Sequence, residues 1–207
     1  MTLIIASISK NGIFIKSDRR RMVMNSSGSV KYYNDDLGKV FVSQDKRIII
    51  YNHGINMING KTWIELAVKS ANQIQQDKVS DINKALNEVE KIVSVDALIE
   101  LSKYQHAYSC AFVVILKTNG NKWVAGEIIW QLGQGVKKTP LGRIILSGSG
   151  TKHLRLSVKH NENSYWASIS VTEAKTEIDL LYADAIKNQD SVRGNELSPT
   201  YDDVIIT

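Results

Sequence analysis

The second residue of the chain is a threonine that directly follows the initiator methionine. Cytosolic methionine aminopeptidases remove Met1 when the next residue is small, and cleavage would leave Thr2 with a free α-amine beside its own hydroxyl. A threonine hydroxyl needs a base to act as a nucleophile at neutral pH, and an α-amine titrates near about 8. One residue could thus supply both nucleophile and base, although an ordinary processed terminus begins in the same way.

Two charged residues stand at strand ends from which they could act on Thr2. The run from Leu3 to Ser9 is apolar and β-branched, and Asn11-Gly12 after it is a strong hairpin signal. The returning strand ends at Asp18, which the antiparallel hairpin brings back to the level of Thr2. Lys39 opens a later apolar strand, and an ammonium near Thr2 would lower the pKa of its hydroxyl and amine. Asp18 would hold that lysine; the alternative is that both are surface charges at strand ends.

The remaining pattern predicts strands, two helices, further strands, a late helix and a final strand. Helical spacing of apolar residues predicts a helix over 61–76 and a second from an N-cap at Ser80 toward Leu101. Ser170 and Glu173 form a capping box for a helix to about Asn188, and Thr151–Lys159 is also predicted to be helical. The predicted strands are 3–9, 13–17, 30–33, 39–43, 47–51, 108–117, 123–130, 143–146 and 204–206.

At this point the sequence resembles the proteasome β-subunit family, including its simpler bacterial peptidases, over nearly the whole chain. The family pattern begins with the nucleophilic threonine and a glycine in the first hairpin turn. It continues with an aspartate and an arginine two residues later, the active-site lysine, a Gly-Ser-Gly before a helix, and an aspartate beyond the late helix. The matching residues, in order, are Thr2, Gly12, Asp18, Arg20, Lys39, Gly148, Ser149, Gly150 and Asp190.

The sequence departs from the family pattern at two places. Where the family usually has a serine three residues after its late aspartate, this chain has Arg193 before Gly194. Where the family has a glycine-rich turn whose backbone N–H forms the oxyanion hole, this chain reads Asn52-His53-Gly54-Ile55. A backbone donor needs no particular side chain, so the N–H of His53 or of Gly54 would serve.

The resemblance implies an α+β fold of the N-terminal-nucleophile hydrolase type, a four-layer α/β/β/α sandwich of two antiparallel sheets flanked by helices, as one domain over residues 1–207. It also implies peptide-bond hydrolysis through an acyl-enzyme on Thr2, with Asp18, Lys39, Ser149 and Asp190 in the catalytic site. Peptides or unfolded proteins would be substrates, no cofactor is needed, and a homo-oligomeric ring, with an ATP-dependent unfoldase as a further partner, is expected.

Two other functions stay open at this stage. The chain could be a non-catalytic, proteasome-like structural subunit, which Arg193 and the altered turn favour, or an amidase for small substrates with the same nucleophile.

Composition argues against several other classes of protein. The net charge of +5 comes from scattered residues, so nucleic-acid binding is not expected. Cys110 is the single cysteine and the histidines are dispersed, so neither disulfides nor a metal site is expected. Without a long apolar run or a secretory leader, a cytoplasmic protein is predicted.

Overall fold

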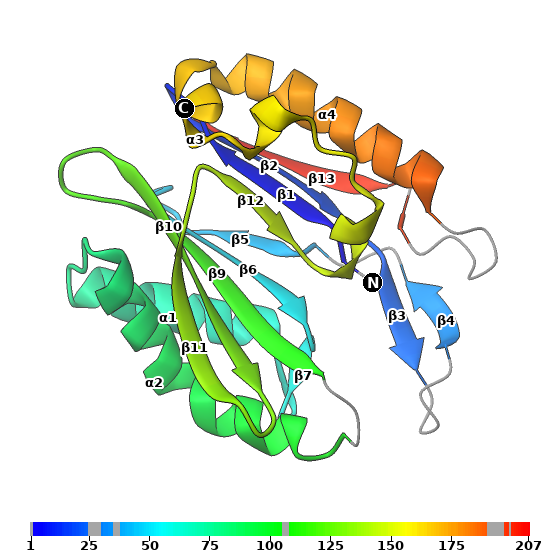
Figure 1. Ribbon diagram of the computed structural model, residues 1–207. Coiled ribbons are helices and arrows are strands. Elements are labelled where there is room, and N and C mark those ends of the chain that lie inside the picture. The colour runs from blue at the N-terminus through cyan, green and yellow to red at the C-terminus, as the bar shows by residue number, and fades with distance from the viewer. Residues whose placement is uncertain (1, 25–29, 35–37, 105–107, 190–196, 199) are drawn as a thin grey trace. The chain divides into compact units, whose positions relative to one another are not determined.

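The computed structural model describes residues 1–207 except 1, 25–29, 35–37, 105–107, 190–196 and 199 (Figure 1). Asp190 and Arg193 therefore lie outside the described residues. By its internal contacts the chain divides into two compact units. Unit 1 comprises residues 1–39 and 143–207, and unit 2 comprises residues 40–142. Each unit is described on its own below, and the expectation of one domain over the whole chain stays a prediction.

Unit 1 is built on a four-stranded antiparallel sheet in the order β12-β1-β2-β13 (Figure 1). Chain order and sheet order differ because the last strand pairs with the first hairpin, so both ends of unit 1 meet in one sheet. The strands are β1 (Ile4–Ile8), β2 (Ile13–Asp18), β12 (Ile144–Ser147) and β13 (Tyr201–Ile206). A separate two-stranded ribbon is formed by β3 (Arg21–Met24) and β4 (Val30–Asn34).

The hairpin of β1 and β2 forms where Asn11-Gly12 predicted it. Ser9 N–H donates to the Gly12 carbonyl at 2.8 Å, which closes the turn. Gly12 also allows a close backbone approach, since a Cβ there would lie 2.3 Å from the Ile206 carbonyl oxygen. The turn thus leaves room for β13 beside β2.

One face of this sheet is covered by α4 (Val171–Asn188). The helix begins as predicted, because Ser170 and Glu173 form a reciprocal capping box. The core between helix and sheet includes Leu3, Ile5, Phe14, Trp166, Ile178, Leu181 and Leu197. The opposite face of the sheet is also apolar, with Ile4, Ala6, Ile13, Ile15 and Ile145 on it.

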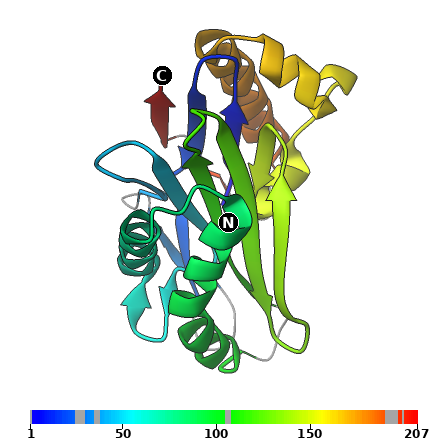
Figure 2. The same cartoon turned by 90° about the vertical axis from the view of Figure 1, so that its left-hand side faces the viewer.

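Unit 2 is built on a five-stranded antiparallel sheet in the order β11-β10-β9-β6-β5, with two helices on one face (Figure 2). The strands are β5 (Val40–Val42), β6 (Ile48–Gly54), β9 (Ser109–Lys117), β10 (Trp123–Gln131) and β11 (Gly135–Leu141). The short hairpin of β7 (Met57–Ile58) and β8 (Lys61–Thr62) leads into the helices α1 (Trp63–Gln76) and α2 (Ile82–Leu101).

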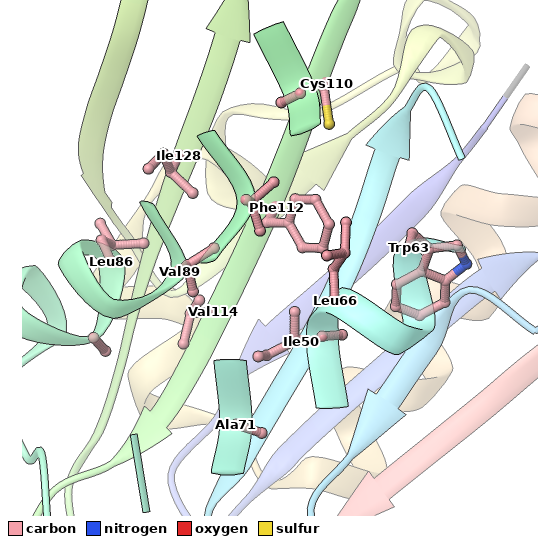
Figure 3. Close-up of a cluster of buried hydrophobic side chains, with 14 of the residues drawn as sticks. Ile50, Trp63, Leu66, Ala71, Leu86, Val89, Cys110, Phe112, Val114 and Ile128 are labelled. Carbon is pink, nitrogen blue, oxygen red and sulfur yellow. The ribbon is translucent and has the colours of Figure 1, made fainter. Parts of the chain in front are cut away.

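The core of unit 2 lies between these helices and the sheet. Figure 3 shows Leu66 of α1 and Val89 of α2 beside Phe112 of β9. Cys110 belongs to this cluster, as expected for a small core residue rather than a reactive thiol. Burial raises the pKa of its thiol to about 12, which keeps it protonated and unreactive.

Several details differ from the sequence-based expectations, and the short strands β3, β7 and β8 were not predicted either. Asp81, not Ser80, caps α2, and the helix ends at Leu101 as predicted. Residues 151–159 do not form one helix: a 3-10 helix, Ser149–His153, is followed by extended residues and a second 3-10 helix, Val158–Asn161. The pattern also missed β11 and the short α3 (Asn163–Ser168), and β13 begins three residues before the predicted strand.

The chain is therefore a mixed α+β protein with antiparallel sheets and flanking helices. Each sheet has one helix-covered face and a second apolar face, which in unit 2 carries Ile49, Tyr51, Val113 and Ile115. The predicted sandwich requires such a face of each half, while the stacking of the two sheets stays a prediction. None of the helices among the described residues has the length and apolar character needed to cross a membrane.

Candidate functional site

Asp18 ties the end of β2 to the residue that follows Thr2. The Asp18 backbone N–H donates to the Leu3 carbonyl at 3.0 Å, and the Leu3 N–H donates to Asp18 Oδ1 at 2.8 Å. Both residues are fully buried. The peptide bond between Thr2 and Leu3 is thereby fixed against the Asp18 carboxylate.

Lys39 reaches the same carboxylate oxygen. Its Nζ donates to Asp18 Oδ1 at 2.7 Å and to the Arg20 carbonyl at 2.7 Å. Lys39 is 2% exposed and Thr2 is 7% exposed, so the ammonium is held inside the protein. Since Lys39 Nζ and Leu3 N share one acceptor atom, the ammonium lies beside the backbone of the first residues of the chain.

The electrostatics of this pair are those of a buried ion pair. Burial raises the pKa of Asp18 above its ordinary value, because loss of water disfavours the carboxylate. The charge of Lys39 and its hydrogen bond oppose this shift, as does the Leu3 N–H. Asp18 Oδ2 is also buried and, within the part of the chain that the structure describes, has no hydrogen-bond partner.

The glycine loop after β12 packs against the backbone of Thr2. Gly150 N–H donates to the Thr2 carbonyl at 2.9 Å. Gly148 has φ +88°, and a Cβ at this position would lie 2.2 Å from the Thr2 carbonyl oxygen and 2.9 Å from Thr2 Cβ. A Cβ at Gly150 would lie 2.8 Å from Leu3 Cβ. Both glycines are thus required by the close approach of the loop to residues 2 and 3, whereas the Ser149 side chain between them is exposed.

Arg20 acts through its backbone as well as its side chain. Its carbonyl accepts from Lys39 Nζ, and its Nη1 donates to the Leu197 carbonyl at 3.3 Å. The arginine thereby links the lysine to the segment that precedes β13. The sequence singled out the side chain of Arg20, but no residue type signals the role of its carbonyl.

The structure therefore brings together Thr2, Asp18, Arg20, Lys39 and the Gly148–Gly150 loop within unit 1. Asp190 and Arg193 lie outside the described residues, as does Met1.

His53 and Gly54 belong to unit 2, where β6 extends through both residues instead of ending in a turn after Tyr51. Ile55 N–H donates to the Ser109 carbonyl at 3.1 Å. Because hydrogen-bonded pairs in an antiparallel ladder recur at every second residue, His53 forms such a pair with Ala111, and its N–H points toward β9.

The Gly54 N–H points to the opposite side of β6, where the pairing with β5 ends at Tyr51. Gly54 has φ +91°, and a Cβ there would lie 2.1 Å from the Ser109 carbonyl oxygen. Of the two candidate oxyanion donors, Gly54 is therefore the one whose N–H is left out of the ladder with β9.

The sequence also gave no indication of a partner for the His53 side chain. His53 Nε2 lies 2.8 Å from Glu127 Oε1, and both residues are partly buried. The only available signal was an acidic residue within the otherwise apolar run of β10. Among the described residues, no group of three or more His, Cys, Asp or Glu side chains is arranged to hold a metal ion.

No protein-family model and no curated protein matches this sequence. Among solved structures, the chain is similar to Anbu (ancestral beta-subunit) from Yersinia bercovieri, with a TM-score of 0.58. The match covers 98% of this chain and 81% of that chain, at 11% sequence identity. The fold is proteasome-like.

At this identity the similarity concerns the fold, and the chemistry has to be argued from the side chains of the chain itself. Chain termini commonly fray, but here residues 2 and 3 are buried beneath a glycine loop and hydrogen-bonded to a buried carboxylate.

Proposed function

We propose that the chain is a proteasome-like threonine peptidase in which Thr2, freed by removal of Met1, is the nucleophile. The observation that carries this proposal is the buried Lys39–Asp18 ion pair, whose shared oxygen also accepts the N–H of Leu3. A buried ion pair often stabilises a protein no more than packed apolar residues would, so stability does not explain its presence. Its position beside the backbone of residue 2 supports a chemical role for the ammonium.

In the proposed reaction, the Thr2 hydroxyl attacks the carbonyl carbon of a peptide bond, and its proton passes to the neutral α-amine of the same residue. The C–N bond then breaks, the departing amine takes up that proton, and an ester remains on Thr2. Water hydrolyses the ester and restores the hydroxyl. The α-amine of Thr2 would thus act as a base when the hydroxyl attacks and as an acid when the C–N bond breaks.

The other residues have supporting roles in this proposal. Lys39 lowers the pKa of the Thr2 hydroxyl and amine by its positive charge, and Asp18 orients Lys39. Ser149 and Asp190 position the α-amine, while the Gly54 N–H stabilises the oxyanion. The Gly148–Gly150 loop fixes the backbone of Thr2, so that its hydroxyl keeps one orientation.

The proposal extends to the setting of the enzyme. Peptides or unfolded proteins are the substrates, the cytoplasm is where methionine aminopeptidases act, and no cofactor takes part. The solved relative is described as an ancestral β-subunit, which supports a homo-oligomeric ring for this chain. An ATP-dependent unfoldase would supply extended substrates to such a ring.

The decisive experiment compares intact mass with activity. Protein expressed in the cytosol is expected to lack one methionine residue and to hydrolyse fluorogenic peptide amides. Thr2→Ala should abolish turnover with the assembly unchanged, and Thr2→Ser, which keeps a hydroxyl, should retain part of it. A Thr2→Ala protein as active as the parent would refute the assignment of the nucleophile.

Retention of Met1 would instead favour the non-catalytic subunit, because an α-amine blocked by a peptide bond cannot serve as base. Hydrolysis of short amides by a monomer or dimer that leaves unfolded proteins intact would favour the small-substrate amidase. Both outcomes are distinguishable in the same preparation by mass, assembly state and substrate length.

A further inference from the structure

The edge strand β13 differs from the other edges of the two sheets. β12 and β5 are short, with four and three residues, and β11 carries Pro140 and two lysines, features that discourage pairing with another strand. β13 has six residues and contains no proline, glycine or lysine. Two of its large side chains are about half exposed, Tyr201 at 48% and Ile205 at 51%.

The hydrogen bonding of β13 shows which of its backbone groups face away from the sheet. Arg19 N–H donates to the Thr200 carbonyl at 3.3 Å, so hydrogen-bonded pairs with β2 recur at every second residue from Thr200 onward. The backbone groups of Tyr201, Asp203 and Ile205 therefore point outward. Within the described part of the chain, no strand pairs with this outer edge.

We propose that β13 is a docking edge for β13 of a second copy of this chain, in an antiparallel pair across a two-fold axis at Asp203. In this register Tyr201 of each copy lies opposite Ile205 of the other, and Asp203 lies opposite itself. All three outward residues then meet outward residues, so six backbone hydrogen bonds form. Sliding the pair by two residues in either direction leaves one of the three residues in each copy without a partner residue.

The side chains fit this self-pairing. An aromatic residue opposite a β-branched residue is a favourable cross-strand pair, and the two-fold axis creates it twice. Two aspartates at the centre would repel each other if they were bare. However, Asp203 is already paired with the buried Lys16 at 2.7 Å and with Lys175 at 3.3 Å. Lys16 and Lys175 also contact Asp179, so the four side chains form a cluster without net charge.

The helix of unit 1 leaves space for the pairing. α4 packs over β2 and β1, which are one and two strands inward from β13 (Figure 1). With strands about 4.8 Å apart, the α4 helices of the two copies would lie about 19 Å from each other. Helices in contact are 8–10 Å apart, so the two helices would not collide. The paired copies would form one continuous eight-stranded sheet.

A cysteine placed on the two-fold axis tests the register directly. Opposite residues of a hydrogen-bonded pair have Cα atoms about 5.5 Å apart, which suits a disulfide. Asp203→Cys should therefore cross-link under mild oxidation to twice the 23.1 kDa chain mass. In the matched control Ile205→Cys, the two cysteines would be about 13 Å apart, and cross-linking should be at least tenfold lower. The native Cys110 is buried and does not interfere.

A proline tests the outward hydrogen bonds without altering those to β2. Because the Ile205 N–H points away from β2, Ile205→Pro removes a donor only from the proposed interface. Sedimentation equilibrium should show the dimer dissociation constant raised at least tenfold for this variant, and unchanged for the control Ile205→Val. If circular dichroism shows that Ile205→Pro does not fold, the Asp203→Cys cross-link still decides the question.

The proposal would be overturned by a monomer at all concentrations, by assemblies insensitive to Ile205→Pro, or by equal cross-linking of the two cysteine variants. An extended peptide bound at this edge would give the first of these results, and a ring assembled through other surfaces would give the second. Because Thr2→Ala does not touch β13, dimerisation of that variant should match the parent, which separates this proposal from the proposed activity.

Discussion

Gly148→Ala is expected to damage the candidate site although it replaces none of the side chains that take part in the proposed reaction. Gly148 has φ +88°, and the added Cβ would lie 2.2 Å from the Thr2 carbonyl oxygen and 2.8 Å from the Thr2 carbonyl carbon. These are backbone atoms of the residue proposed as nucleophile. They cannot rotate away as the end of a flexible side chain would.

Two costs determine how strongly Gly148→Ala reduces activity, the strain of the backbone at residue 148 and the displacement of Thr2. A left-handed backbone costs a residue with a Cβ about 1–2 kcal/mol. In addition, relief of the contact requires a movement of about 1 Å between the loop and Thr2, since carbon and oxygen atoms in contact lie more than 3 Å apart. A misplacement of about 1 Å at a reacting group lowers the rate roughly 100-fold. Hydrolysis by Gly148→Ala should therefore fall by at least that factor.

Gly133→Ala is the matched control for the backbone term. Gly133 has φ +77°, and a Cβ there would meet no atom within 4 Å. Thermal unfolding should show a similar cost of the left-handed backbone in both variants and a further loss only in Gly148→Ala. Peptide hydrolysis should fall only in Gly148→Ala. If the two variants unfold at the same temperature and are equally active, the loop does not position Thr2 as described.

Three further predictions concern charges and the thiol. Asp18→Asn should lower the free energy of unfolding, measured by urea titration, by about 3 kcal/mol, because it leaves the buried Lys39 without its counter-charge. The control Asp202→Asn removes a partly exposed ion pair with Arg19 and should cost less than about 1 kcal/mol in the same titration. Cys110, with a pKa raised to about 12 by burial, should react with a thiol reagent only as fast as the protein unfolds; rapid labelling of the native protein would contradict its place in the core. Hydrogen bonds with His160 and Lys159 together lower the pKa of Glu177 from 4.5 to about 2. Ionised Glu177 therefore contributes roughly 3 kcal/mol at most to the free energy of unfolding, fully above pH 4.5 and progressively less as the pH falls toward 2. The stabilities of the parent and of Glu177→Gln should converge over that pH interval. A difference in stability that stays constant with pH would refute this linkage.

The parts of the fold that the sequence predicted are those specified by local signals. The first hairpin forms where Asn11-Gly12 indicated a turn, with the Ser9 N–H and the Gly12 carbonyl closing it around Lys10 and Asn11. Neither Asn11 nor Gly12 has a positive φ, so what requires glycine at position 12 is the close approach of Ile206 and not the turn conformation. Ser170 with Glu173 starts α4 because the two side chains satisfy backbone groups within one turn of the helix. In both cases the deciding interactions lie within four residues of each other, so sequence spacing alone is informative.

The missed parts depend on contacts that are distant in the sequence. β11 has the sequence Gly-Val-Lys-Lys-Thr-Pro-Leu, which is too polar for a strand on its own, and it forms because all seven of its residues pair with β10. Residues 151–159 were predicted to form one helix, but only a 3-10 helix over Ser149–His153 forms before the chain extends, and Gly150 within it donates its N–H to the Thr2 carbonyl. A segment that packs against the start of the chain cannot be identified from its own periodicity.

For the candidate site, the sequence predicted the charged side chains and the glycines but not the backbone groups that join them. Asp18 and Lys39 were predicted from strand ends and from the family resemblance, and the structure places them 2.7 Å apart. The Leu3 N–H and the Arg20 carbonyl, which complete the arrangement, have no signature because every residue carries such groups. Only a register between strands shows which of them converge.

The arrangement around Thr2 also bears on the choice between an enzyme and a structural subunit. If unit 1 needed only a stable sheet, an apolar residue at position 39 would avoid the desolvation of two charges, since replacing a buried ion pair by packed apolar residues is often neutral or stabilising. Lys39→Met with Asp18→Leu applies this reasoning. A structural subunit should tolerate the double substitution with unchanged assembly and stability and without losing any function. An enzyme should keep its assembly but lose turnover even though Thr2 is still present and Met1 is still removed. A double variant that hydrolyses peptides as fast as the parent would remove the ion pair from the mechanism and leave the burial of Lys39 without a chemical explanation.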